Sequence, residues 1–303
     1  MLQNSFRKIG IHWPIKSTSK ILEALYVVFK SFLLAILFIY VVGGIWLIPI
    51  AFLLPNHFAS FEAVTLSGRL IERMSFLFSF LAATGYVNFW NKDFKSLLPF
   101  TDSSWKIKAD YFLRIAFISF FCVALSYLIS YLLGYIKINN IKNSFIVTNP
   151  SSGLWNIFLL GVVGHFLVAL GEETVYRGVV FRYLLVKTDS KTFALIVSAL
   201  IFSLFHFHYE MPFSFLIAFL MGGFLALIYL HYGSLLYCIS IHWAYNLFMH
   251  IFMPSSKNYL PDYIDVSLQE VPGWGSYFTL IRTIILALIL LIFVRNKNQI
   301  QIR

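Results

Sequence analysis

The chain has 303 residues, of which 59% are hydrophobic and only 12% are charged, and its mean hydropathy is +0.79. This composition indicates a polytopic membrane protein and leaves no length for a separate soluble catalytic domain. Basic loops that face anionic lipid account for the formal net charge of +10, so membrane lipid is an expected partner and nucleic acid is not.

Apolar stretches in chain order predict an all-α fold, a polytopic transmembrane helical bundle of about eight spans. They cover about residues 31–54, 74–90, 111–136, 154–186, 192–208, 212–230, 234–253 and 276–294. The fourth is too long for one straight membrane helix, so we expect it to bend or break near Gly171 or to extend past the membrane.

The predicted spans form one integrated membrane domain with three parts. Residues 1–150 are an N-terminal membrane scaffold of about three spans, residues 151–253 are the catalytic core, and residues 254–303 are an external loop and the last transmembrane helix. The first apolar run is long enough to span and lacks a cleavage site, so it is expected to be retained.

Alternate loops differ in their content of Lys and Arg. One side receives 14 of these residues and the other receives five, which predicts that both termini are cytoplasmic. A compact polytopic chain of this kind suits the bacterial inner membrane. Cys122 and Cys238 both lie in apolar runs and predict no disulfide framework.

Two adjacent carboxylates, Glu172 and Glu173, lie within the long fourth span. An ionisable group at membrane depth costs a few kcal/mol, so it persists where it is paired or used. Arg177 is four residues after Glu173 and shares its helix face, which predicts an ion pair. Glu172 points about 100° away and has no arginine on its face. That position suits it to act as a general base.

Further polar residues lie in the fifth and seventh spans. Phe202 and His206 are four residues apart, as are His242 and Asn246, so each pair shares one helix face. Glu172 and His206 are predicted to activate a water, and His242 and Asn246 to donate hydrogen bonds to the oxyanion formed at a peptide carbonyl. The residues therefore point to peptide hydrolysis inside a membrane.

At these positions the chain resembles the CPBP intramembrane proteases, the ABI family of CAAX and bacteriocin-processing proteases that includes Rce1-like prenyl endopeptidases. Its first motif, two glutamates followed after three residues by an arginine, is matched by Glu172, Glu173 and Arg177. The second is matched by Phe202 and His206, and the last by His242 and Asn246. The resemblance covers roughly residues 150–253 and implies the roles given above, with Glu173 and Arg177 in support.

This resemblance leaves the metal open, because the family has been described both as metalloproteases and as glutamate-dependent proteases without metal. We favour no cofactor; a divalent ion such as Zn²⁺, if bound, would take His206, His242 and Glu172 as ligands. The resemblance implies a peptide or lipidated-protein substrate, either with a CAAX-type tail or as a peptide precursor.

Other functions are compatible with the same residues. Buried carboxylates and histidines also form transporters and proton relays, although this chain lacks repeat-related halves. A non-catalytic bacteriocin-immunity protein on the same scaffold is a further alternative. Individually, the polar residues could also be structural: His165, His231 and His250 lie outside the motifs and are interpreted as packing or interfacial residues, and Gly161, Gly164, Gly222 and Gly223 as close helix-packing positions.

Overall fold

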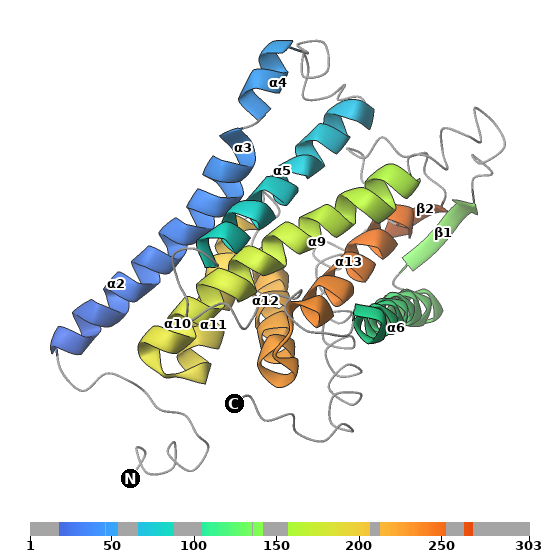
Figure 1. The fold of residues 1–303 in the computed structure, drawn as a ribbon. Coiled ribbons are helices and arrows are strands. Elements are labelled where there is room, and N and C mark those ends of the chain that lie inside the picture. The colour runs from blue at the N-terminus through green and yellow to red at the C-terminus, as the bar shows by residue number, and fades with distance from the viewer. Residues whose placement is uncertain are drawn as a thin grey trace, which may run out of the picture.

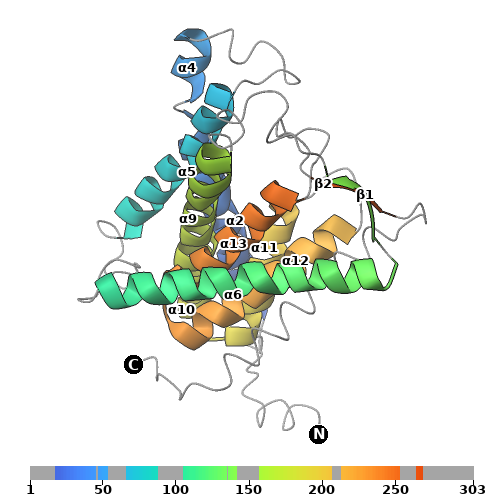
Figure 2. The ribbon, with the colours of Figure 1, turned by 90° about the vertical axis from the view of Figure 1, so that its right-hand side faces the viewer.

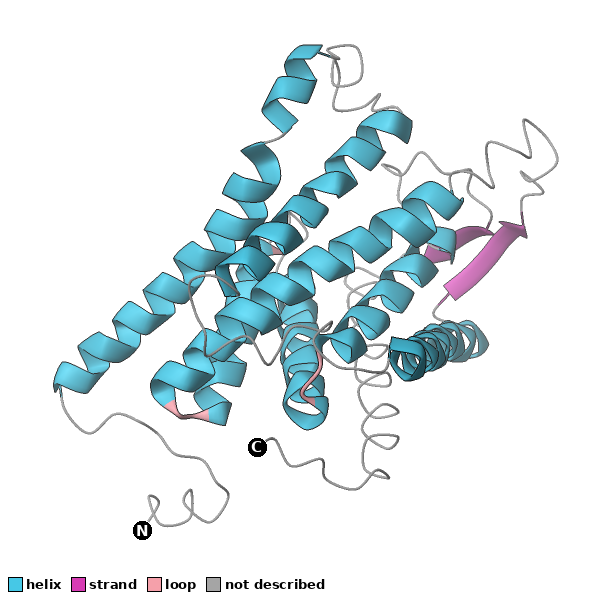
Figure 3. Ribbon diagram, in the orientation of Figure 1, coloured by secondary structure: helices cyan, strands magenta, loops and turns pink. Residues whose placement is uncertain are grey.

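The computed structural model describes residues 18–45, 47–53, 66–87, 105–134, 136–141, 157–206, 213–252 and 264–268. Helices dominate these ranges, and two short strands lie at one end (Figure 3). The N-terminal helical elements are α2 (Thr18–Ala35), the π-helix η1 (Ile36–Val42), α3 (Gly43–Ile45), α4 (Leu47–Leu53), α5 (Leu66–Gly85) and α6 (Trp105–Leu132). The C-terminal ones are the π-helix η5 (Ile157–Gly164), α9 (His165–Glu173), the π-helix η6 (Thr174–Phe181), α10 (Arg182–Thr188), α11 (Lys191–Phe205), α12 (Phe213–Tyr232) and α13 (Leu235–Phe252).

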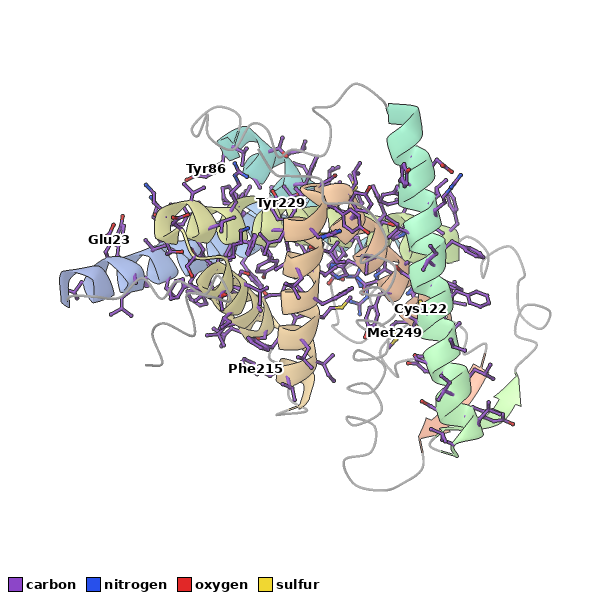
Figure 4. All side chains as sticks on the ribbon, turned by 90° about the horizontal axis from the view of Figure 1, so that it is seen from below. Glu23, Tyr86, Cys122, Phe215, Tyr229 and Met249 are labelled. Atoms are coloured by element: carbon purple, nitrogen blue, oxygen red, sulfur yellow. The ribbon has the colours of Figure 1, made fainter. Side chains whose placement is uncertain are left out.

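The long continuous helix made of η5, α9, η6 and α10 is at the centre of the bundle. In Figure 1 α5 lies between α9 and the long α2–α4 helix, and α13 lies on the other side of α9. Figure 2 shows α6 running across this group, where it packs on α13. The contact includes Tyr127 Oη of α6, 3.4 Å from Sδ of Met249, whose side chain lies beside α6 in Figure 4. The central helix is thus enclosed by scaffold on several sides.

A tight turn joins α10 to α11. Asp189 has a left-handed backbone conformation with φ of 48°, and Ser190 caps α11 by accepting a hydrogen bond from the backbone N–H of Phe193 at 3.3 Å. This turn reverses the chain, so α11 returns along the helix that carries the glutamates.

The two strands are an addition to the predicted all-α fold. β1 (Ile136–Ile141) follows α6 and pairs antiparallel with β2 (Ile264–Leu268), with an irregularity between Ile138 and Asn140. The sequence predicts loops or span ends in both segments. Their pairing joins residues more than a hundred positions apart, and no local pattern signals such a contact.

Seven of the eight predicted spans coincide with described helices, and the eighth, 276–294, lies outside the described residues. Four helices within the described ranges are long and apolar enough to cross a membrane, namely Leu22–Pro49, Ala109–Leu132, Phe158–Thr188 and Phe215–Tyr232. An integral membrane protein is therefore supported, while eight spans and cytoplasmic termini remain predictions.

The long fourth span does not break at Gly171. Helical structure continues from Ile157 to Thr188, and its irregularity is a widening into π-turns on either side of α9. Gly171 is needed for close packing instead, because a Cβ there would lie 2.5 Å from the backbone oxygen of Phe76 on α5. The backbone of α5 therefore approaches α9 one residue before Glu172.

Substitution of Gly171 by alanine should destabilise the protein by about 1–3 kcal/mol, because α5 must move away from α9. Gly85→Ala is the matched control, since a Cβ at Gly85 meets nothing within 4 Å. The control should be neutral or stabilising by up to about 1 kcal/mol, the helix-propensity gain of alanine. Unfolding in mixed micelles measures both. Equal stabilities of the two variants would contradict this account of Gly171.

Candidate functional site

Glu172 and Glu173 occupy the end of α9, where the helix passes into the π-helix η6. Glu172 is 9% exposed and Glu173 is fully buried. π-helical turns are rare and occur frequently at functional sites. Here such a turn begins immediately after the two carboxylates.

Glu173 is the centre of a buried network that joins four helices. Its Oε1 accepts hydrogen bonds from Arg177 Nη1 at 2.9 Å and from His242 Nδ1 at 2.7 Å. Arg177 Nη2 donates to the backbone oxygen of Gly222 at 3.0 Å, and its guanidinium lies 4.6 Å above the ring of Phe202. The predicted ion pair between Glu173 and Arg177 is present. Sequence reasoning missed the bond to His242 and the contact with Gly222.

Glu172 has a different environment. Its Oε2 is buried and has no hydrogen-bond partner in the described part of the protein. It lies 3.7 Å from Nε2 of His206 and 3.9 Å from Nε2 of His242. Both distances exceed a direct hydrogen bond but match two groups that share a bridging water. The carboxylate predicted as the base thus faces the two predicted histidines.

His206 is positioned by the residue four places before it. It caps the end of α11, its Nδ1 lies 2.8 Å from the backbone oxygen of Phe202, and the two rings are 4.2 Å apart. A carbonyl oxygen only accepts, so Nδ1 carries the proton and the lone pair of Nε2 faces Glu172. This geometry gives a physical reason for the spacing between Phe202 and His206.

His242 is oriented in the same way by Glu173. Because Nδ1 donates to that carboxylate, the neutral ring has an unprotonated Nε2, and it can donate to an oxyanion only as the imidazolium. Asn246 is half-buried one helical turn further along α13. The catalytic roles of these residues remain predictions.

The three predicted metal ligands face one another, with Glu172 Oε2 at 3.7 Å from His206 Nε2 and at 3.9 Å from His242 Nε2. Glu172, His206 and His242 have the donor chemistry that Zn²⁺ prefers. Within the ranges that the structure describes, however, no three His, Cys, Asp or Glu side chains are grouped so as to hold a metal ion. The absence of a metal stays a prediction, and we assign no reaction step to a metal.

A second polar cluster, which sequence reasoning missed, lies further along the same helices. His165 at the start of α9 and His250 near the end of α13 are interpreted as packing or interfacial residues, and their rings do pack together, 4.8 Å apart in an edge-to-face contact. The signal available in the sequence was the spacing of His242, Asn246 and His250, which places a polar residue on each of three successive turns.

Comparison with known families agrees with this geometry. Residues 154–248 match the family described as Type II CAAX prenyl endopeptidase Rce1-like, and they contain every predicted catalytic and supporting residue. The chain therefore carries an Rce1-like domain, which confirms the resemblance drawn from the motifs. No curated protein and no solved structure matches the chain.

Proposed function

We propose that this chain, which carries an Rce1-like domain over residues 154–248, is an intramembrane endopeptidase that uses Glu172 and His206 to activate a water. The observation that carries the proposal is the buried Oε2 of Glu172, which has no hydrogen-bond partner among the described residues and lies 3.7 and 3.9 Å from two histidine nitrogens. A water bound between these atoms has acceptors for its protons next to a carboxylate side chain that is only 12% exposed.

The proposed reaction begins when the Glu172 carboxylate takes a proton from this water. The water oxygen forms a bond to the peptide carbonyl carbon, and the carbonyl π-electrons move to the carbonyl oxygen. The Nε2–H of protonated His242 and the amide of Asn246 donate hydrogen bonds to this oxyanion. The C–N bond then breaks, and the leaving amine receives the proton held by Glu172, while His206 keeps the carboxyl group in position.

The substrate we propose is a peptide or lipidated protein at the membrane, with a CAAX-type tail or as a peptide precursor. The apolar surroundings of the site and the matched family support this class. They also favour an endopeptidase over a transporter, a proton relay or a bacteriocin-immunity protein. We further propose the bacterial inner membrane as its location.

Purified protein in lipid vesicles should cleave such a peptide, and cleavage should persist after chelation and removal of divalent metal, because the proposed mechanism contains no metal step. Mass spectrometry of the products locates the cut, with membranes from cells lacking the gene as a source of candidate substrates. Absence of cleavage in any membrane peptide would refute the endopeptidase. Activity that is lost on chelation and restored only by Zn²⁺ would refute the metal-free mechanism.

A further inference from the structure

Trp243 lies on α13 directly after His242, near the middle of the predicted span 234–253. Tryptophan side chains of membrane proteins favour the two membrane interfaces, where the indole N–H meets water. Away from water that N–H needs a partner within the protein. It has one, because Nε1 of Trp243 donates to the backbone oxygen of Val162 in η5 at 2.9 Å. This bond ties α13 to the central helix beside a predicted catalytic residue.

Two further rings hold the indole of Trp243 in place. Phe112 of α6 stacks on it with ring centroids 5.7 Å apart, and Phe166 of α9 meets it edge-to-face at 6.0 Å. Phe112 and Phe166 also contact each other, with their centroids 6.1 Å apart. Aromatic pairs at such distances are favourable beyond the area they bury. The indole is therefore fixed against α6, α9 and η5, with its N–H on one backbone oxygen.

Hydrogen bonds from three neighbouring positions join α13 to three other elements. Besides the bond from Trp243 to η5, Ser240 Oγ donates to a backbone oxygen of α6 at 2.6 Å, and His242 Nδ1 bonds to Glu173 of α9 at 2.7 Å. Successive residues of an α-helix are 100° apart, so Ser240 and Trp243 share one side of α13. His242 and Asn246 share another side, about 110° away. Rotation of α13 about its axis would break the first two bonds and displace the predicted catalytic side.

We propose that Trp243 is a positioning residue, whose bond to Val162 fixes the rotation of α13. In that position His242 Nδ1 stays on Glu173, and Asn246 keeps the same side of the helix toward the peptide carbonyl. This role rests on the proposed function, but the orientation of His242 can be observed without any cleavage. Loss of the indole N–H frees the rotation, so the bond between His242 and Glu173 forms in fewer molecules.

The test uses Trp243→Phe, which removes the N–H and keeps an aromatic ring. Nitrogen NMR of isotope-labelled histidine in full-length protein in lipid vesicles measures how often Nδ1 of His242 is protonated, and His242→Ala identifies the signal. The unprotonated fraction should rise about 3- to 10-fold in Trp243→Phe, which corresponds to one lost hydrogen bond. In cleavage assays kcat should fall about 10- to 100-fold with KM unchanged, as expected for misplacement of groups on the order of 1 Å.

Phe248→Leu is the matched packing control on the same helix. Phe248 packs on Phe120 and Tyr127 of α6, each with ring centroids 5.1 Å away, so its loss weakens the same helix contact without removing an anchoring hydrogen bond. This variant should lower the melting temperature and leave the protonation of His242 and kcat as in the wild type. A change in His242 as large as in Trp243→Phe would mean that packing alone sets the rotation, and would overturn the proposal.

Ser240→Ala removes the other anchoring bond with little change in volume, so it provides the test if Trp243→Phe does not fold. It should also raise the unprotonated fraction at His242 Nδ1. Unchanged protonation in Trp243→Phe, or in Ser240→Ala where only that variant folds, would refute the positioning role alone. The expected NMR change in a protein whose wild type cleaves no membrane peptide would refute the proposed function alone.

Discussion

Replacement of Glu172 by glutamine should reduce peptide cleavage by about 10²- to 10⁴-fold, the contribution typical of general-base catalysis. Glutamine has nearly the same shape, but its amide cannot accept a proton from water. Oε2 of Glu172 has no hydrogen-bond partner in the part of the chain that the structure describes, so helical content and yield should not change. Initial cleavage rates in lipid, measured with a fluorogenic peptide, test this directly.

The neighbouring positions provide graded comparisons in the same assay. His206→Ala removes the second group that faces Glu172, and Asn246→Ala should reduce the rate by about 100-fold if the amide donates to the oxyanion. His231→Ala, in the last turn of α12, is the control and should cleave as the wild type does. Normal cleavage by both Glu172→Gln and His206→Ala would show that the proposed mechanism is wrong.

Local spacing was enough to predict part of this site. Glu173 and Arg177 are four residues apart on one helix, and they form the expected ion pair at 2.9 Å. The same spacing relates Phe202 to His206, whose ring is fixed by the backbone oxygen one turn earlier. Such contacts depend on helix geometry alone, which the apolar pattern already determines.

Contacts between helices were not accessible in the same way. The bond from His242 to Glu173 joins residues 69 positions apart, and it changes the role of Glu173 from a partner of Arg177 to the residue that orients a histidine. The packing at Gly171 is a second contact of this kind. The sequence suggested a bend or break near this glycine, whereas the close approach of the α5 backbone on the opposing helix requires it. Packing of this kind depends on tertiary arrangement and leaves no periodic signal.

Removal of Arg177 should have the largest effect on stability. Arg177→Ala leaves Glu173 fully buried with a single partner, and it also takes a donor from the Gly222 oxygen and a cation from the face of Phe202. Breaking one side of a buried ion pair costs about 3–5 kcal/mol. Arg177→Lys should recover only part of this loss, because an ammonium group cannot reproduce the planar contacts to both Glu173 and Gly222.

The protein contains a matched exposed pair for comparison. Arg114 and Asp110 on α6 have the same spacing and the same distance of 2.9 Å as Arg177 and Glu173, but their side chains are 70% and 54% exposed. Arg114→Ala should therefore cost at most about 0.5 kcal/mol. The free energy of unfolding in mixed micelles, measured for both variants, reports the effect of burial, since both are arginine–carboxylate pairs with the same spacing and distance. Similar losses in the two variants would show that the Glu173 network does not depend on its burial, and that Arg177 has a role other than neutralising the carboxylate beside the proposed base.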